Sequence, residues 1–158
     1  MRTSGRVFAV IVFGVAAVLA LASTAAADPV SSTDTDYLAA LHHGGLCCPE
    51  QSDMPISFAD PASEISNGHT IARVMGESNN AYGNETYAGF KTLSTTIFKN
   101  SHTNSDLRPL NTLQSGEVVL IAVHYYGGQA LECALIKDMG DEAGYWYGRP
   151  KAVAPYCY

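Results

Sequence analysis

The sequence predicts an all-α fold: a small bundle of about four helices followed by a disulfide-stapled C-terminal extension. Two observations favour helices. Apolar residues recur at helical spacing in several segments, and residues that start or stop helices stand at the ends of those segments. The chain also has the length of one ordinary domain, which can bury a substantial core.

The N-terminus has the three parts of a secretory signal peptide. Arg2 and Arg6 begin it, the uncharged apolar run Val7–Ala22 follows, and an Ala-x-Ala sequence ends at Ala27. The alternative is an uncleaved membrane anchor, but the run is shorter than the roughly 20 apolar residues that span a bilayer. We expect residues 1–27 to be removed, leaving a secreted or cell-envelope protein.

Charge restricts the partners of the mature chain. Without Arg2 and Arg6, seven basic residues remain against fifteen acidic ones, a net charge of −8. This negative field repels phosphates, so we expect no nucleic acid as a partner. It also disfavours anionic lipid, and we expect no membrane association after signal cleavage. An unidentified protein or small ligand remains as the partner.

The first predicted helix spans 34–43, after a polar lead-in at 28–33. Thr33 and Asp36 have the spacing of a capping box, and Gly44-Gly45 stops the helix.

The second predicted helix spans 61–75. Asp60-Pro61 combines an N-cap with a proline at the first helical position, and Gly76 is a natural stop. The expected inward face consists of Ile65, His69, Ala72 and Met75.

The third predicted helix spans 84–98, and a polar loop follows at 99–111. The expected inward face of this helix consists of Tyr87, Phe90, Ser94, Ile97 and Phe98.

The segment 112–126 is ambiguous from local evidence. Asn111 or Thr112 could cap a helix, yet residues 118–126 have the composition of a strand, and Gly127-Gly128 could turn it into a hairpin with 130–136. If the segment is helical, one core should contain residues from all four helices: Leu38, Leu41, Ile65, Ala72, Ile97, Val118 and Ala122.

Three segments in order resemble the mycobacterial DUF732 domain family. They begin at Asp36-Tyr37-Leu38, at Asp60-Pro61 and at Leu110, the last one running to Tyr126. The resemblance covers residues 34–128 and leaves 129–158 as an extension. It implies a small exported helical domain without an established activity, and it favours a helix over 112–126.

The chain departs from that family at two positions. The family usually has a cysteine in the second helix and another after the final tyrosine, where this chain has Ala72 and Gly127. If those cysteines pair in the family, the Cα atoms of Ala72 and Gly127 should lie within about 7 Å. The stretch Cys47–Ala59 also resembles an insertion.

All four cysteines lie in the mature chain, and an even number in an exported protein indicates disulfides. Cys47 and Cys48 are adjacent, so a bond between them would close a strained ring. We expect each to pair instead with Cys133 or Cys157, and the choice between the two pairings stays open.

No pattern indicates a catalytic or metal site. His42, His43, Cys47 and Cys48 lie close together but lack the spacing of zinc ligands, and no serine stands in a Gly-x-Ser-x-Gly sequence. We therefore expect no catalytic residue, metal or cofactor. Five residues could still ligate haem: Tyr37, His42, His69, His124 and Tyr125.

The aromatic cluster Tyr145, Trp146 and Tyr147 is the candidate contact surface. Exposed, it could stack on a sugar or hold a partner, and buried, it would anchor the tail to the helices, which we favour. The leading hypothesis is an exported, non-enzymatic helical domain with a structural or binding role. The alternative is a small-ligand carrier, with haem as the first candidate, and a hydrolytic or thiol enzyme ranks third.

Overall fold

The computed structural model describes residues 31–46, 61–82, 86–103 and 109–158. The expected signal peptide and the stretch Cys47–Ala59 lie outside these ranges. Within them, 89% of the residues are helical and none forms a strand. This confirms the all-α class.

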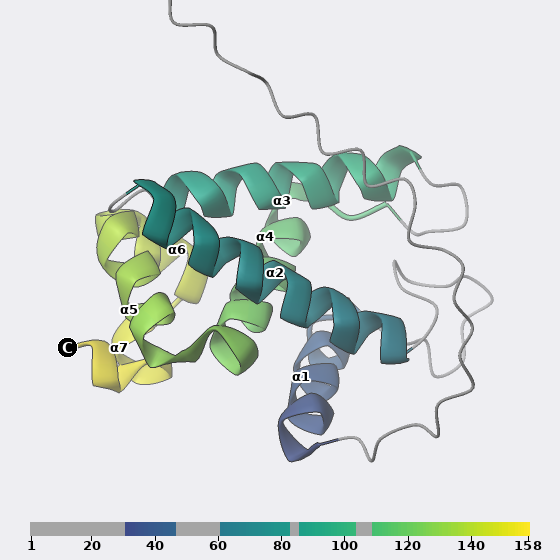
Figure 1. Cartoon of the computed structure of the whole chain (residues 1–158), viewed down its shortest axis with the longest axis horizontal. Helices are drawn as coiled ribbons and strands as arrows, with labels where there is room; N and C mark the ends of the chain where they lie inside the picture. Colours follow the sequence, from purple (N-terminus) through teal and green to yellow (C-terminus); the bar gives the residue numbers. More distant parts are fainter. Residues whose placement is uncertain (1–30, 47–60, 83–85, 104–108) are drawn as a thin grey trace, which may run out of the picture.

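The first three helices are α1 (Ser32–His43), α2 (Pro61–Tyr82) and α3 (Thr86–Thr103). The elements that follow are α4 (Thr112–Ala122), the π-helical turn η1 (Val123–Gly127), α5 (Gly128–Met139), the 3-10 turn η2 (Gly140–Glu142), α6 (Ala143–Tyr147), α7 (Pro150–Val153) and the 3-10 turn η3 (Pro155–Cys157). In Figure 1, α2 and α3 run along one side, with α1 at one end and α5 to α7 at the other.

Helix α4 is the centre of the core, behind α2 in Figure 1. It contacts α1, α2, α3 and α6. Its buried residues are Ser115, Gly116, Val118, Val119, Leu120 and Ala122. Each fully buried valine or leucine contributes about 1.5–3 kcal/mol, far more than the few tenths by which β-branched residues disfavour a helix. The strand alternative is therefore absent from the described residues.

The N-terminus of α1 differs from the predicted capping box. Ser31 is the N-cap: its Oγ accepts a hydrogen bond from the backbone N–H of Asp34 at 3.1 Å, and the Asp34 carboxylate accepts one from Ser31 N–H. The prediction of Thr33 and Asp36 is wrong by two residues, because Ser31 and Asp34 have the same spacing. Asp34 also accepts a 2.8 Å hydrogen bond from Tyr126, which connects α1 to η1.

At the start of α4, Asn111 is the N-cap, one of the two residues predicted. Its side chain accepts from the Gln114 N–H at 2.9 Å, and Gln114 accepts from the Asn111 N–H at 3.0 Å.

Two helices extend beyond their predicted ends. Helix α2 continues past Gly76 to Tyr82. An ion pair of 2.5 Å joins Arg73 and Glu77, the residues on either side of this glycine along the helix.

Helix α3 continues to Thr103, so the first part of the predicted 99–111 loop is helical. Polar side chains hold this last turn. Ser101 Oγ donates to the Phe98 carbonyl and accepts from the Leu110 backbone N–H, and Nδ1 of His102 lies 2.9 Å from the same carbonyl.

The predicted core is largely present. Leu41, Val118 and Ala122 belong to one buried cluster, Ala72 is buried, and Leu38 and Ile97 pack against the cluster. Ile65 is half-buried and outside it, and His69 is exposed. The rings of Tyr37 and Tyr126 pack on Gly68, so α2 is rotated from the expected face and turns Gly68, Ile71 and Met75 inward.

The extension shares this core. Leu131, Leu135, Met139 and Ala154 belong to the same buried cluster as the earlier helices. The chain changes direction between η1 and α5 at Gly128, whose φ of +74° lies in the left-handed region that favours glycine.

One helical run among the described residues, Thr112–Tyr147, is long and apolar enough to cross a membrane. Its most apolar 18-residue window has a mean hydropathy of 1.3, and 44% of that window is buried in the protein. A buried core helix passes the same test, and the bend at Gly128 divides this run within the bundle.

Candidate functional site

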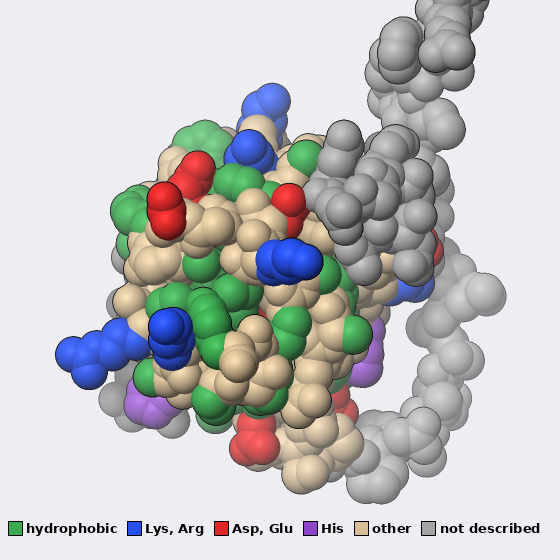
Figure 2. Space-filling view, turned by 90° about the vertical axis from the view of Figure 1, so that its left-hand side faces the viewer, with side chains coloured by type: hydrophobic (Ala, Val, Ile, Leu, Met, Phe, Trp, Pro, Cys, Tyr) green, Lys and Arg blue, Asp and Glu red, His purple; other side chains and the backbone are tan. Residues whose placement is uncertain are grey.

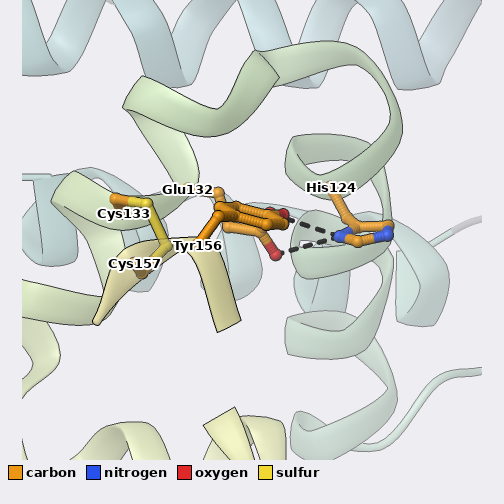
Figure 3. Close-up of a disulfide and its surroundings, with 5 residues drawn as sticks. All are labelled: His124, Glu132, Cys133, Tyr156 and Cys157. Carbon is orange, nitrogen blue, oxygen red and sulfur yellow. Dashed lines mark hydrogen bonds and ion pairs between the residues drawn. A yellow bond between two sulfur atoms is a disulfide. The ribbon is translucent and has the colours of Figure 1, made fainter. Parts of the chain in front are cut away.

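A buried carboxylate lies at the junction of three C-terminal segments. Glu132 on α5 is only 1% exposed, because the residues around it turn this face of the helix toward the core. Nδ1 of His124 lies 3.0 Å from its Oε1, and the hydroxyl of Tyr156 donates to its Oε2 (Figure 3). The three side chains come from η1, α5 and η3.

The charges of this cluster stabilise one another. The hydrogen bond to Glu132 raises the pKa of His124, against an opposing effect of burial. Burial alone would raise the pKa of Glu132, but the hydrogen bonds from His124 and Tyr156 and the charge of His124 outweigh it and hold that pKa below its usual value. The cluster is therefore an imidazolium–carboxylate pair over a mildly acidic pH range.

A disulfide lies beside this cluster. Cys133 follows Glu132 on α5, Cys157 follows Tyr156 on η3, and the two cysteines are bonded with their Cα atoms 5.0 Å apart (Figure 3). The predicted pairing of Cys133 and Cys157 with Cys47 and Cys48 is wrong, because η3 turns back along α5 and brings the two C-terminal cysteines together. Cys47 and Cys48 lie outside the described residues.

Next to the buried pair is a surface hollow of about 300 Å³. Its apolar walls come from α4, α6 and α7, and His124 and Glu132 lie at one side. The lining residues are Gly44, Glu117, Leu120, Ile121, His124, Glu132, Trp146, Tyr147 and Val153. This volume is at the lower end of the range for small-molecule pockets.

Glu117 is the second carboxylate of the hollow. It precedes Ile121 by one turn of α4, and both residues line the hollow together with His124 of η1. The side chain is half-buried, and burial raises its pKa. Among the described residues, no hydrogen bond or ion pair engages its carboxylate.

Two rings of the predicted aromatic cluster line the hollow. Trp146 packs edge to face on Phe90, with ring centroids 4.8 Å apart, and the buried Tyr147 hydroxyl has no hydrogen-bond partner among the described residues. Burial, and then the charges of Glu132 and Tyr156, raise the pKa of Tyr147. Tyr145 is 70% exposed and does not line the hollow. The cluster thus anchors α6 with two rings and exposes the third.

The candidate haem ligands do not line one hollow, although Tyr125 packs edge-on against both Tyr37 and His124. Tyr37 is fully buried, His42 is exposed at the end of α1, and His69 stacks on Tyr126 with ring centroids 3.9 Å apart. Of the five candidate ligands, only His124 lines the hollow, and the ring of Tyr125 packs edge-on against the His124 ring. Within the described ranges, no group of three His, Cys, Asp or Glu side chains could hold a metal ion.

The face formed by α5 and the C-terminus carries a second hollow of about 420 Å³ beside the disulfide. It is lined by Cys133, Ala134, Ile136, Lys137, Gly140, Cys157 and Tyr158. Figure 2 shows hydrophobic side chains gathered on this face, with Lys and Arg side chains around them. Tyr156 and Tyr158 remain 43% and 63% exposed.

A third hollow, of about 550 Å³, separates α2 from α5, and both Ala72 and Gly127 line it. These are the two positions where the family that the sequence resembles usually has cysteines.

Sequence reasoning missed Glu117, Glu132 and Tyr156 as parts of a site. Glu132 did carry a signal, since it is a lone charge between Leu131 and Leu135 on the apolar face of a helix. Glu117 carried none, because a single glutamate on a helix is ordinarily solvated.

Comparison with family models, curated protein sequences and solved structures finds no match for this chain.

Proposed function

We propose that this chain is an exported, non-enzymatic binding domain of the cell envelope or culture fluid. In this proposal the hollow between α4 and α6–α7 is its ligand site. One observation carries it: an apolar hollow contains the Glu117 carboxylate, which no described residue pairs with, and it lies beside the Cys133–Cys157 disulfide and the His124–Glu132 ion pair. Pre-organisation of this kind lowers the entropic cost of binding.

The chain offers a direct probe of binding. Trp146 is the only tryptophan of the sequence, and it lines the hollow. Titration of the purified mature protein with a library of small apolar fragments should change the fluorescence of Trp146. Ile121→Phe, which narrows the hollow, should weaken those responses. Leu113→Phe, on the same helix but outside the lining, should leave them intact. A library without a single responsive fragment would contradict the proposal.

Export and cleavage of the signal peptide can be tested separately from ligand binding. Mass spectrometry of the secreted protein should find an N-terminus at Asp28, after the Ala-x-Ala sequence. Full-length chain retained in the membrane fraction would contradict cleavage.

We further propose that residues 34–128 are a DUF732-like domain. The helical state of 112–126, which the resemblance favours over the strand suggested by composition, supports this.

A haem carrier is the second candidate function, and one observation favours it. Nδ1 of His124 is held by a buried carboxylate, so Nε2 is the ring nitrogen left for a ligand, as in many metal-ligating histidines. Haemin titration tests it. A Soret shift that His124→Ala abolishes would favour the carrier, and no shift would remove it.

A further inference from the structure

The charges around the hollow indicate the chemistry of its ligand. Its charged lining residues are Glu117, His124 and Glu132, and no Lys or Arg is among the residues that line it. With His124 protonated, the two carboxylates and one imidazolium that line the hollow carry a net charge of −1.

That negative charge belongs to Glu117. The imidazolium of His124 compensates Glu132 at 3.0 Å, and Tyr156 donates a further hydrogen bond to the same carboxylate. Glu117 lies on the other side of Ile121 along α4, and no described residue pairs with it. A half-buried carboxylate without a partner is destabilised by desolvation, so a cation that reaches it relieves that cost.

The rest of the lining suits an apolar body. Leu120, Ile121 and Val153 supply aliphatic surface, and the rings of Trp146 and Tyr147 add aromatic surface, which also attracts cations.

We propose that the hollow binds a small apolar molecule that carries one protonated amino group, with the ammonium against Glu117 and the apolar part on the Leu120–Ile121–Val153 wall. This inference rests on the proposed function, because it names the ligand class of the same site. A carboxylate ligand would meet the charge of Glu117 and the net negative charge of the chain. A neutral ligand would bury Glu117 further without compensating it.

Three probes of the same ring and similar length test the class: 2-phenylethylamine, 2-phenylethanol and 3-phenylpropanoate. Each is titrated into the mature protein below pH 6.5, where the raised pKa of His124 keeps its imidazole protonated, with Trp146 fluorescence and calorimetry as readouts. The amine should bind about tenfold more tightly than the alcohol, and the carboxylate should bind most weakly.

Two variants locate the effect. Glu117→Gln should bring the amine and the alcohol to similar affinity, because it removes the charge that attracts the ammonium and also the desolvation cost that this carboxylate imposes on the alcohol. Asp36→Asn removes the same charge from an exposed position on α1 and should preserve the preference for the amine.

The failures are distinguishable. Equal affinity of amine and alcohol in the parent protein, or a preference that survives Glu117→Gln, would overturn the ligand class while the hollow remains a binding site. Absence of binding by all three probes, together with a silent fragment library, would overturn both proposals.

Discussion

The six-membered ring of Trp146 lies directly on the backbone of Gly116, where an added Cβ would be 2.2 Å from Cζ3. This contact places the indole between α3 and α4 and forms one wall of the hollow. Gly116→Ala must therefore displace the ring, and we expect a loss of about 1–3 kcal/mol of stability. Urea denaturation followed by Trp146 fluorescence measures it.

Gly144→Ala is the matched control for that variant. Gly144 lies one turn of α6 or less from Trp146, but a Cβ there meets nothing within 4 Å. Its unfolding midpoint should stay equal or rise slightly, since alanine favours helix. Equal stability of Gly116→Ala and the parent would contradict the close packing.

Tyr156→Phe removes a hydrogen bond to a buried carboxylate and keeps the ring. We expect a loss of about 1–2 kcal/mol, because the buried carboxylate of Glu132 loses one of its two donors. Tyr145→Phe, at a mostly exposed position, should change stability little. Thermal unfolding of both variants measures the difference. Equal melting temperatures for the two variants would show that the Tyr156–Glu132 hydrogen bond does not stabilise the fold.

The His124–Glu132 pair should make stability depend on pH in two opposite directions. The raised pKa of His124 gives stability that is full below its ordinary value of 6.5 and is lost as pH rises through the folded pKa. The lowered pKa of Glu132 gives stability that is present above 4.5 and is lost as pH falls through its folded pKa.

The difference in stability between the parent and His124→Gln should therefore be largest between pH 4.5 and 6.5. It should be no more than about 1 kcal/mol, because His124 is partly solvated. Chemical denaturation across this range measures it. A difference that grows toward alkaline pH would show that the pair is not ionic.

The disulfide should be a major source of stability for the C-terminal segment. Cys133 and Cys157 are 24 residues apart, and a loop of this length corresponds to about 3.5 kcal/mol in the chain-entropy model. The double variant Cys133→Ser with Cys157→Ser should lose stability of that order. Peptide mapping of the oxidised protein should recover a linked Cys133–Cys157 peptide, and a peptide linking either one to Cys47 or Cys48 would contradict this pairing.

An engineered bridge tests the alignment with the resembled family. Ala72→Cys together with Gly127→Cys should form a disulfide under mild oxidation, since both positions line one hollow. A Cβ on Gly127 meets only the end of the Leu131 side chain at 2.9 Å, and that side chain can move. Two free thiols after oxidation would show that the positions are too far apart.

Local signals in the sequence were sufficient for the starts of α2 and α4 and for the end of α1. Pro61 begins α2, Asn111 caps α4, and Gly44 ends α1, because each residue acts on its own backbone. Such signals failed at the ends of α2 and α3. A glycine or a polar residue costs a helix only about 1 kcal/mol or less. Burial of Met75, next to Gly76, offsets that cost in α2, and the hydrogen bonds of Ser101 hold the last turn of α3.

Contacts between distant segments decided the rest. Burial of α4 on several sides selected a helix for a sequence with the composition of a strand. The return of η3 along α5 selected the cysteine pairing and placed Tyr156 on Glu132. Glu117 and Trp146 became one site only when α6 packed on α4. Spacing along the chain carries no information on these pairs, because their free energy comes from surfaces that meet only in the folded protein.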